Sequence, residues 1–251
     1  MRYLGIEPLR PKVGVFSFTC CEGCVLQLAN KEETLGPFLQ AIEVVNFREV
    51  TTDQGTDYDI ALVEGSISRS DEVDSLRKIR EQAKVLVALG TCAVFGGVNR
   101  QKDAFSIEEA NKIVYGDHPK ESWPIRAVHE VVQVDLAIPG CPINKAELER
   151  IVQHVALELP WQFPEYPVCV ECKQRFTVCM FDKGQLCLGP LVRAGCDAPC
   201  PAGGLGCWGC RGPAADPNRA EFEALVKERG FSRADVEDRL SFFGGFEGTR
   251  P

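Results

Sequence analysis

The chain has 251 residues, of which 45% are hydrophobic, and its formal net charge is −8. These values are typical of a folded soluble protein with one large domain, or one domain and an appendage. No run of about 18 apolar residues occurs, so no membrane span is predicted, and an acidic chain without a basic cluster is not expected to bind nucleic acid. The opening segment MRYLGIEPLRPK does not resemble an export leader, which predicts a cytoplasmic protein with reduced cysteines.

Residues 1–160 alternate short apolar runs with helical patterns, which is typical of a parallel sheet wrapped by helices on both faces. The pattern predicts a flavodoxin-like α/β domain. Strands are expected at 13–18, 42–45, 60–63, 85–89 and 132–138. Helices are expected after Ser70, after the capping box of Ser106 and Glu109, and after Asn144 with Glu147.

Cysteines follow three of the predicted strands directly. They are Cys21 and Cys24 after the first strand, Cys92 in a GTCA loop, and Cys141 in a PGCP loop. Because the carboxyl ends of parallel strands meet at one edge of a sheet, these four thiolates are expected to converge and to hold a 4Fe-4S cluster. Neighbouring glycines would let the backbone approach and donate N–H groups to sulfur. The alternative is that Cys92 and Cys141 are ordinary buried residues.

Residues 161–251 hold an ordered array of cysteines. They are Cys169, Cys172, Cys179, Cys187, Cys196, Cys200, Cys207 and Cys210. Eight thiolates make two complete sets for 4Fe-4S clusters, and Cys196-x-x-x-Cys200-Pro201 matches the end of a bacterial ferredoxin cluster run. Disulfides are an alternative, but such scaffolds are typically short and secreted. Two zinc sites are another, although a single zinc ribbon does not explain four cysteines between the outer pairs.

Glycine and proline are dense between Cys169 and Pro213, and apolar periodicity is absent there. This segment is expected to form an irregular iron-sulfur domain that builds no conventional core and depends on its clusters for order. Two short helices are expected within 219–243, the second capped by Ser232 and Asp235. No residue of this tail is expected to carry chemistry.

Together the motifs resemble the small, electron-transferring subunit of cytoplasmic NiFe hydrogenases of the methyl-viologen-reducing, deazaflavin-reducing and sulfhydrogenase types. The resemblance covers about residues 12–212. It rests on the C-x-x-C of Cys21 and Cys24, VEGSI from Val63 to Ile67, GTCA, PGCP and the eight-cysteine array. It implies that a partner large subunit activates hydrogen. This chain would then belong to an enzyme, carry no catalytic residue itself, and relay electrons between the NiFe site and a further redox subunit.

The resemblance implies three 4Fe-4S clusters. The implied ligands are Cys21, Cys24, Cys92 and Cys141 for a proximal cluster, Cys196, Cys200, Cys207 and Cys210 for a medial one, and Cys169, Cys172, Cys179 and Cys187 for a distal one. Periplasmic members have a histidine in place of Cys169 and a proline in place of Cys200. The thirteenth cysteine, Cys20, is interpreted as a buried thiol beside the proximal cluster, the alternative being that it replaces Cys21 as a ligand.

Two other functions remain open at this point. A complex I type quinone-module subunit would share only the proximal site, whereas a zinc-stabilised binding module would share the cysteines without the redox chemistry. The sequence does not specify the terminal electron acceptor, and no G-x-G-x-x-G loop follows a strand, so a nucleotide cofactor is expected on another subunit. Glu22 and Glu64 are expected near the large-subunit face, where one of them is hypothesised to orient the interface or relay protons.

Overall fold

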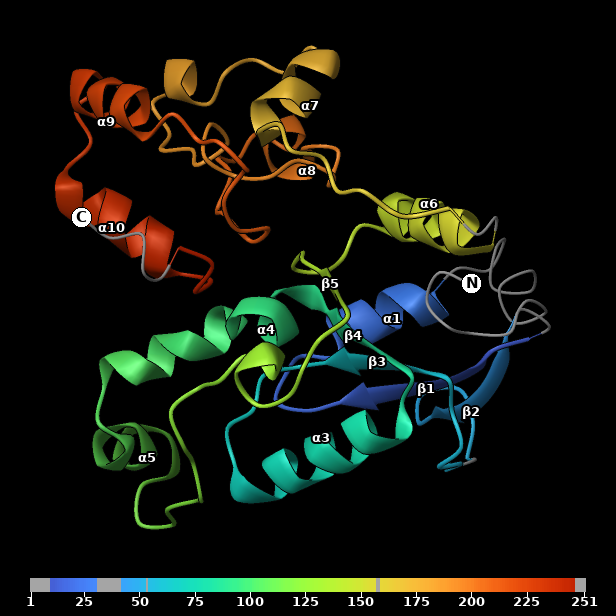
Figure 1. The fold of residues 1–251 in the computed structure, drawn as a ribbon. Coiled ribbons are helices and arrows are strands. Elements are labelled where there is room, and N and C mark those ends of the chain that lie inside the picture. The colour runs from blue at the N-terminus through green and yellow to red at the C-terminus, as the bar shows by residue number, and fades with distance from the viewer. Residues whose placement is uncertain (1–9, 31–41, 53, 157–158, 247–251) are drawn as a thin grey trace. The chain divides into compact units, whose positions relative to one another are not determined.

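The computed structural model describes residues 10–30, 42–52, 54–156 and 159–246 (Figure 1). The chain divides into two compact units, Met1–Trp161 and Gln162–Pro251, called unit 1 and unit 2 below. Within those described ranges, no helix is long and apolar enough to cross a membrane.

Unit 1 is built on a five-stranded parallel sheet with the strand order β2-β1-β3-β4-β5. Its strands are β1 (Lys12–Ser17), β2 (Glu43–Phe47), β3 (Ile60–Glu64), β4 (Val85–Leu89) and β5 (Leu136–Ile138). This order is that of flavodoxin, with its topological switch point between β1 and β3. The predicted flavodoxin-like α/β fold is therefore confirmed.

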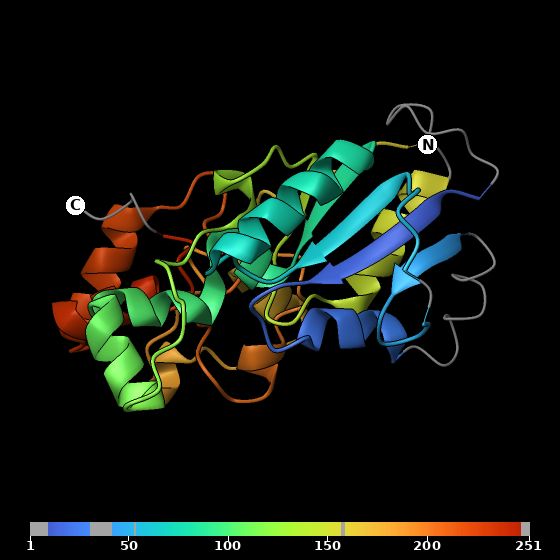
Figure 2. The same cartoon turned by 90° about the horizontal axis from the view of Figure 1, so that it is seen from below.

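Helices cover both faces of this sheet. The helices of unit 1 are α1 (Gly23–Ala29), α3 (Ser70–Gln82), α4 (Gly90–Phe95), α5 (Ile107–Tyr115) and α6 (Lys145–Ala156), with the 3-10 helices η2 (Gly97–Ala104) and η3 (Val128–Glu130). Helix α3 packs on one face, whereas α1 and α6 lie on the other (Figures 1 and 2). Leu76 and Ile79 of α3 share one buried cluster with Val63 and Leu86 of the sheet. Burial of these apolar side chains is the main force that joins the layers.

The helix starts predicted from the sequence are confirmed. Ser106 and Glu109 form the capping box of α5, and the side chain of Asn144 accepts the N–H of Glu147 at 2.9 Å at the start of α6. Each cap supplies an acceptor for N–H groups that a helix leaves without an internal partner.

Two predicted elements of unit 1 differ from the structure. The strand expected at 132–138 is shorter, since only Leu136–Ile138 form β5. The side-chain carboxylate of Asp135 accepts the N–H of Leu86 in β4, so strand pairing between β4 and β5 begins only at Val87 and Leu136. The GTCA segment, expected to be a loop, forms helix α4 immediately after β4. Cys92 therefore lies in the first turn of a helix.

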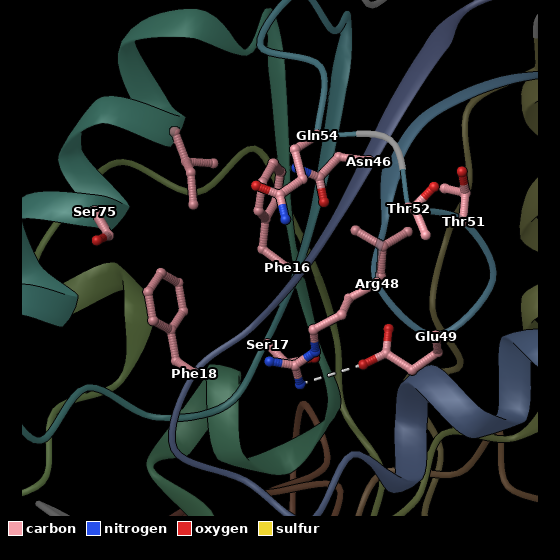
Figure 3. Close-up of a pocket in the computed structure, with 12 residues that line it drawn as sticks. Phe16, Ser17, Phe18, Asn46, Arg48, Glu49, Thr51, Thr52, Gln54 and Ser75 are labelled. Atoms are coloured by element: carbon pink, nitrogen blue, oxygen red, sulfur yellow. Dashed lines mark hydrogen bonds and ion pairs between the residues drawn. The ribbon is translucent and has the colours of Figure 1, made fainter.

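The connection from β2 to β3 leaves a pocket of about 480 Å³ on the face of the sheet that α3 partly covers (Figure 3). Phe16 and Phe18 form its apolar part, and Arg48, bonded to Glu49 at 3.4 Å, lies in its polar wall. No cysteine lines this pocket. Its place in the fold is therefore distinct from the strand ends that carry the thiols.

Unit 2 combines short helices with irregular loops. Its elements are α7 (Val168–Gln174), η4 (Phe181–Lys183), α8 (Pro199–Ala202), α9 (Arg219–Glu228) and α10 (Arg233–Ser241). The two predicted tail helices are confirmed, and Ser232 with Asp235 forms the capping box of α10.

The expectation that the cysteine-rich segment builds no core is wrong. Phe181, Leu188 and Val192 are buried in one hydrophobic cluster that also includes Phe222 and Val226 of α9. Apolar periodicity is absent because a single 3-10 turn and irregular loops, not a long helix or strand, bring the first three side chains inward. The tail helices complete this core, which gives the tail a structural role.

Candidate iron-sulfur sites

The structure brings four of the predicted thiols together at the carboxyl edge of the sheet. Cys21 and Cys24 follow β1, Cys92 follows β4, and Cys141 follows β5. Burial, followed by the charges of Cys141, Cys20 and Cys21, raises the pKa of Cys92 to about 12. Burial, followed by the charges of Glu64 and Cys141, likewise raises the pKa of Cys24. Ligands sit at this edge of open α/β sheets.

Glycines make room for the sulfur atoms at this edge. A Cβ on Gly90 would lie 2.3 Å from the Sγ of Cys24, and one on Gly97 would lie 2.7 Å from the Sγ of Cys92. Both glycines have positive φ, 84° and 66° respectively, which side chains disfavour. The two positions therefore require glycine for both conformation and space.

Glu64, at the end of β3, caps the helix that carries Cys24. One carboxylate oxygen accepts the N–H of Cys24 at 3.0 Å and the other accepts that of Val25 at 2.9 Å. The Glu64 residue is only 2% exposed, and burial raises its pKa while the two N–H groups oppose that shift. A carboxylate at a helix N-terminus also interacts favourably with the helix dipole. Glu64 thus holds the Cys24 loop against the sheet.

Glu22 and Cys20 have different surroundings from Glu64. Glu22 forms an ion pair with Arg48, and its N–H donates to the Sγ of Cys20 at 3.4 Å. Burial, followed by the charge of Glu64, raises the pKa of Cys20 to about 12. Cys20 lies near the other thiols of this edge, but it is half-buried where a buried thiol was expected.

A second group of thiols forms around helix α7 in unit 2. Burial, followed by the charges of Cys187, Cys172 and Cys179, raises the pKa of Cys169 to about 12. A Cβ on Gly189 would lie 3.3 Å from the Sγ of Cys187 and 3.4 Å from that of Cys169. The structure therefore gathers the four cysteines of the predicted distal set.

Three cysteines of the predicted medial set form a third group. The charges of Cys210, Cys187 and Cys196 contribute, after burial, to the raised pKa of Cys207. The N–H of Cys207 also donates to the Sγ of Cys187 at 3.2 Å, which joins this group to the previous one. Cys200 stands apart: burial raises its pKa, and no other thiol is among the causes.

Two buried charged residues beside Cys196 were not predicted from the sequence. Glu171 accepts the N–H groups of Gly195 at 2.7 Å and Asp197 at 2.9 Å, and so fixes the loop that holds Cys196. Arg211 is 1% exposed, and its Nε donates to the carbonyl of Ala194 at 2.8 Å. Their positions in the sequence could have drawn attention to them, since Glu171 lies inside one C-x-x-C motif and Arg211 directly follows another. Cysteine spacing does not show, however, that these two side chains contact the loop of Cys196.

The three groups supply the thiolate ligands that iron-sulfur clusters use. Tetrahedral zinc needs sulfur atoms about 2.3 Å from a common centre. In a cubane each thiolate binds a different iron corner, so its four sulfur atoms stand farther apart. Grouped, largely buried thiols with glycine beside them suit this arrangement.

Comparison with known families places the chain within one of them. Residues 21–155 match the family described as NADH ubiquinone oxidoreductase, 20 kDa subunit. The chain is also 38% identical over 221 residues to the sulfhydrogenase 2 subunit delta of Pyrococcus furiosus, covering 86% of this chain and 92% of that protein. It is 30% identical over 239 residues to a subunit of the vhu hydrogenase of Methanocaldococcus jannaschii, covering 81% and 82% of the two chains.

Solved structures agree with this fold. A chain of an NAD⁺-reducing [NiFe]-hydrogenase superposes with a TM-score of 0.56 at 24% identity, covering 62% of this chain and 96% of that one. A chain of the NiFeSe hydrogenase from Desulfomicrobium baculatum gives a TM-score of 0.54 at 18% identity, covering 86% and 98%. The fold and the thiol groups thus define an iron-sulfur subunit of the oxidoreductase class. The chain belongs to the 20 kDa subunit family, and the predicted resemblance to hydrogenase small subunits is confirmed.

Proposed function

We propose that this chain is the electron-relay subunit of a cytoplasmic NiFe hydrogenase. It connects the NiFe site of a partner large subunit with a further redox subunit and holds three 4Fe-4S clusters. The observation that carries the proposal is the grouping of eleven of the twelve cysteines that the resemblance assigns to cluster ligands, all except Cys200. A single-cluster quinone-module subunit would have no use for the eight thiols of unit 2.

The ligand sets proposed are those that the resemblance implies. Cys21, Cys24, Cys92 and Cys141 form the proximal set, Cys196, Cys200, Cys207 and Cys210 the medial set, and Cys169, Cys172, Cys179 and Cys187 the distal set. Cys21 and Cys141 are exposed. Cover by the large subunit would remove this edge from water and oxygen, so a stable complex is expected.

When bound, 4Fe-4S clusters accept and release one electron at a time. The residues of this chain position the thiolates and set their electrostatic surroundings. Glu64 fixes the helix of Cys24, while Glu171 and Arg211 place opposite charges beside Cys196. The N–H of Cys207 donates to the sulfur of Cys187, and such bonds stabilise the negative charge of a thiolate. Burial of these groups strengthens each of these interactions.

Iron and acid-labile sulfide analysis of the anaerobically purified native complex, with EPR of the reduced protein, tests this proposal. About twelve iron and twelve sulfide per chain are expected, with spectra of interacting reduced clusters. About four iron would favour the quinone-module alternative, with clusters absent from unit 2. Zinc without iron would favour the zinc-stabilised binding module and contradict the relay.

Exchanging Cys200 for proline is expected to convert the medial 4Fe-4S cluster to a three-iron form. The reason is that one iron corner loses its thiolate, and the reduction potential should rise because cluster type and charge change. EPR of the oxidised complex, which detects a three-iron centre directly, and redox titration measure the result.

Cys20→Ala is the matched control, because Cys20 is the one cysteine assigned to no cluster. This variant is expected to keep about twelve iron and unchanged spectra. An unchanged four-iron spectrum in Cys200→Pro would show that Cys200 is not a ligand. Loss of about four iron in Cys20→Ala would transfer the proximal ligand role from Cys21 to Cys20.

A further inference from the structure

The end of helix α7 has an unusual residue in a position that normally belongs to glycine. The N–H of Phe176 donates to the carbonyl of Lys173 at 2.9 Å, and the N–H of Thr177 donates to that of Cys172 at 3.2 Å. This pair of bonds defines a Schellman motif, whose left-handed residue is usually glycine. Phe176 occupies that position with a φ of 54°. A bulky side chain is strained in this conformation.

Helix α9 ends in the same motif with the usual residue. The N–H of Gly230 donates to the carbonyl of Lys227 at 3.1 Å, and that of Phe231 donates to Val226 at 3.0 Å. Gly230 has a φ of 78°. In unit 2, therefore, α9 ends with glycine in the left-handed position and α7 ends with phenylalanine. Phenylalanine in that position does not stabilise the fold.

The side chain of Phe176 is also exposed to water, so it does not offset the backbone strain by burial. Phe176 is 95% exposed, and the nearby Val178 and Val170 are 57% and 38% exposed. An aromatic ring in water contributes no burial energy to the folded chain. Strain and exposure together, at one residue, indicate a function other than folding.

The loop that carries Phe176 is held firmly in place. The Arg175 guanidinium donates to the carbonyl of Asp197 at 2.9 Å and to its carboxylate at 2.8 Å. The loop also joins Cys172 to Cys179, two thiols of the proposed distal set. Phe176 is thus a preorganised aromatic side chain beside that set, and preorganised aromatic anchors dominate the energetics of protein interfaces.

The chain segment that carries this aromatic anchor is basic. Residues 173–178, KQRFTV, contain two cations and no acid, and Asp197 balances only Arg175. Lys173 is exposed. A complementary surface would offer an apolar socket for the ring and acidic side chains around it, and such complementarity steers association.

We propose that Phe176 is the anchor by which unit 2 binds the redox protein that exchanges electrons with it. That partner supplies an apolar socket rimmed by carboxylates, and Lys173 faces the rim. The inference rests on the proposed relay function, because the loop owes its position beside Cys172 and Cys179 to that function. A second copy of this chain and the large subunit are the other possible occupants, which the test separates.

The test compares the native complex with its Phe176→Gly variant, both purified anaerobically through a tag on this chain. Glycine suits the left-handed position, so the melting temperature is expected to stay the same or rise. The dissociation constant of the redox subunit is expected to increase at least about thirtyfold. Hydrogen-dependent reduction of methyl viologen, a small dye that needs no docking, should be unchanged, whereas reduction through the redox subunit should fall.

Leu205→Ala is the matched control, because Leu205 is another exposed apolar residue of unit 2. It is expected to leave the redox subunit bound. Zero-length coupling with a water-soluble carbodiimide should link Lys173 to a carboxylate of the redox subunit, and Lys173→Gln should remove that link. Native mass spectrometry identifies which subunit each variant loses.

An iron-loaded, hydrogen-active Phe176→Gly complex that keeps its redox subunit would overturn the docking role alone. Loss of the large subunit, or separation of two copies of this chain, would overturn the choice of partner. A wild-type complex that lacks iron would instead overturn the relay function on which the inference rests.

Discussion

Replacing Phe222 with alanine is expected to destabilise unit 2 by about 3–5 kcal/mol. Phe222 is 3% exposed, and its ring centroid lies 6.5 Å from that of Phe181, which follows Cys179 in the chain. Truncation would leave a cavity in the cluster that supports the loop between Cys179 and Cys187. The melting temperature of unit 2 should fall by more than about 10 °C, and iron should be lost from the complex.

Glu223→Ala is the matched control for this prediction. Glu223 is the next residue of α9 and is exposed, so its replacement should change stability by no more than about 0.5 kcal/mol. Melting followed by circular dichroism, with iron analysis before and after heating, measures both variants. Equal melting of the two would show that the tail does not support the core.

Replacing Glu64 with glutamine is expected to cost about 2–4 kcal/mol, because it weakens two charge-assisted hydrogen bonds. Both carboxylate oxygens of Glu64 accept N–H groups from the start of α1. An amide offers one oxygen only, so its NH₂ group would face the N–H of Cys24 or Val25. The Cys24 loop should loosen, and about four iron should be lost per chain. Thermal melting and iron analysis measure these effects.

Glu22→Gln is the matched control, since Glu22 is a partly exposed neighbour paired with Arg48. Its replacement should cost no more than about 1 kcal/mol. Comparison of the Glu64→Gln and Glu22→Gln variants also distinguishes a structural role of Glu64 from a role in proton relay. Loss of stability with unchanged hydrogen turnover per loaded complex supports the cap, whereas lost turnover at an unchanged melting temperature would favour the relay hypothesis.

Much of unit 1 could be predicted because its signals are local. A capping box such as that of Ser106 and Glu109 spans four residues, and the apolar run 85–89 forms β4 with the predicted bounds. The convergence of Cys21, Cys92 and Cys141 follows from one rule, that parallel strands end at the same edge. None of these inferences needed a contact between residues far apart in the chain.

Long-range contacts set the limit of that reasoning. The role of Glu64 depends on N–H groups 40 and 39 residues earlier in the chain, and Asp135 shortens β5 through a bond to Leu86. Sequence patterns report which residues are apolar or able to cap, but not which distant partner packing will bring to them. Sequence-based expectations therefore failed where one distant side chain decided the local structure.

The sequence by itself determined the existence and order of the strands, the capped helix starts and the family resemblance, because propensity, caps and cysteine spacing act within a few residues. Only the tertiary structure decided which thiols are neighbours in unit 2, where the N–H of Cys207 meets the sulfur of Cys187. It also decided that Phe222 and Val226 complete a core and that Phe176 stays in water. The physical reason is that burial depends on the packing of segments that no short-range pattern connects.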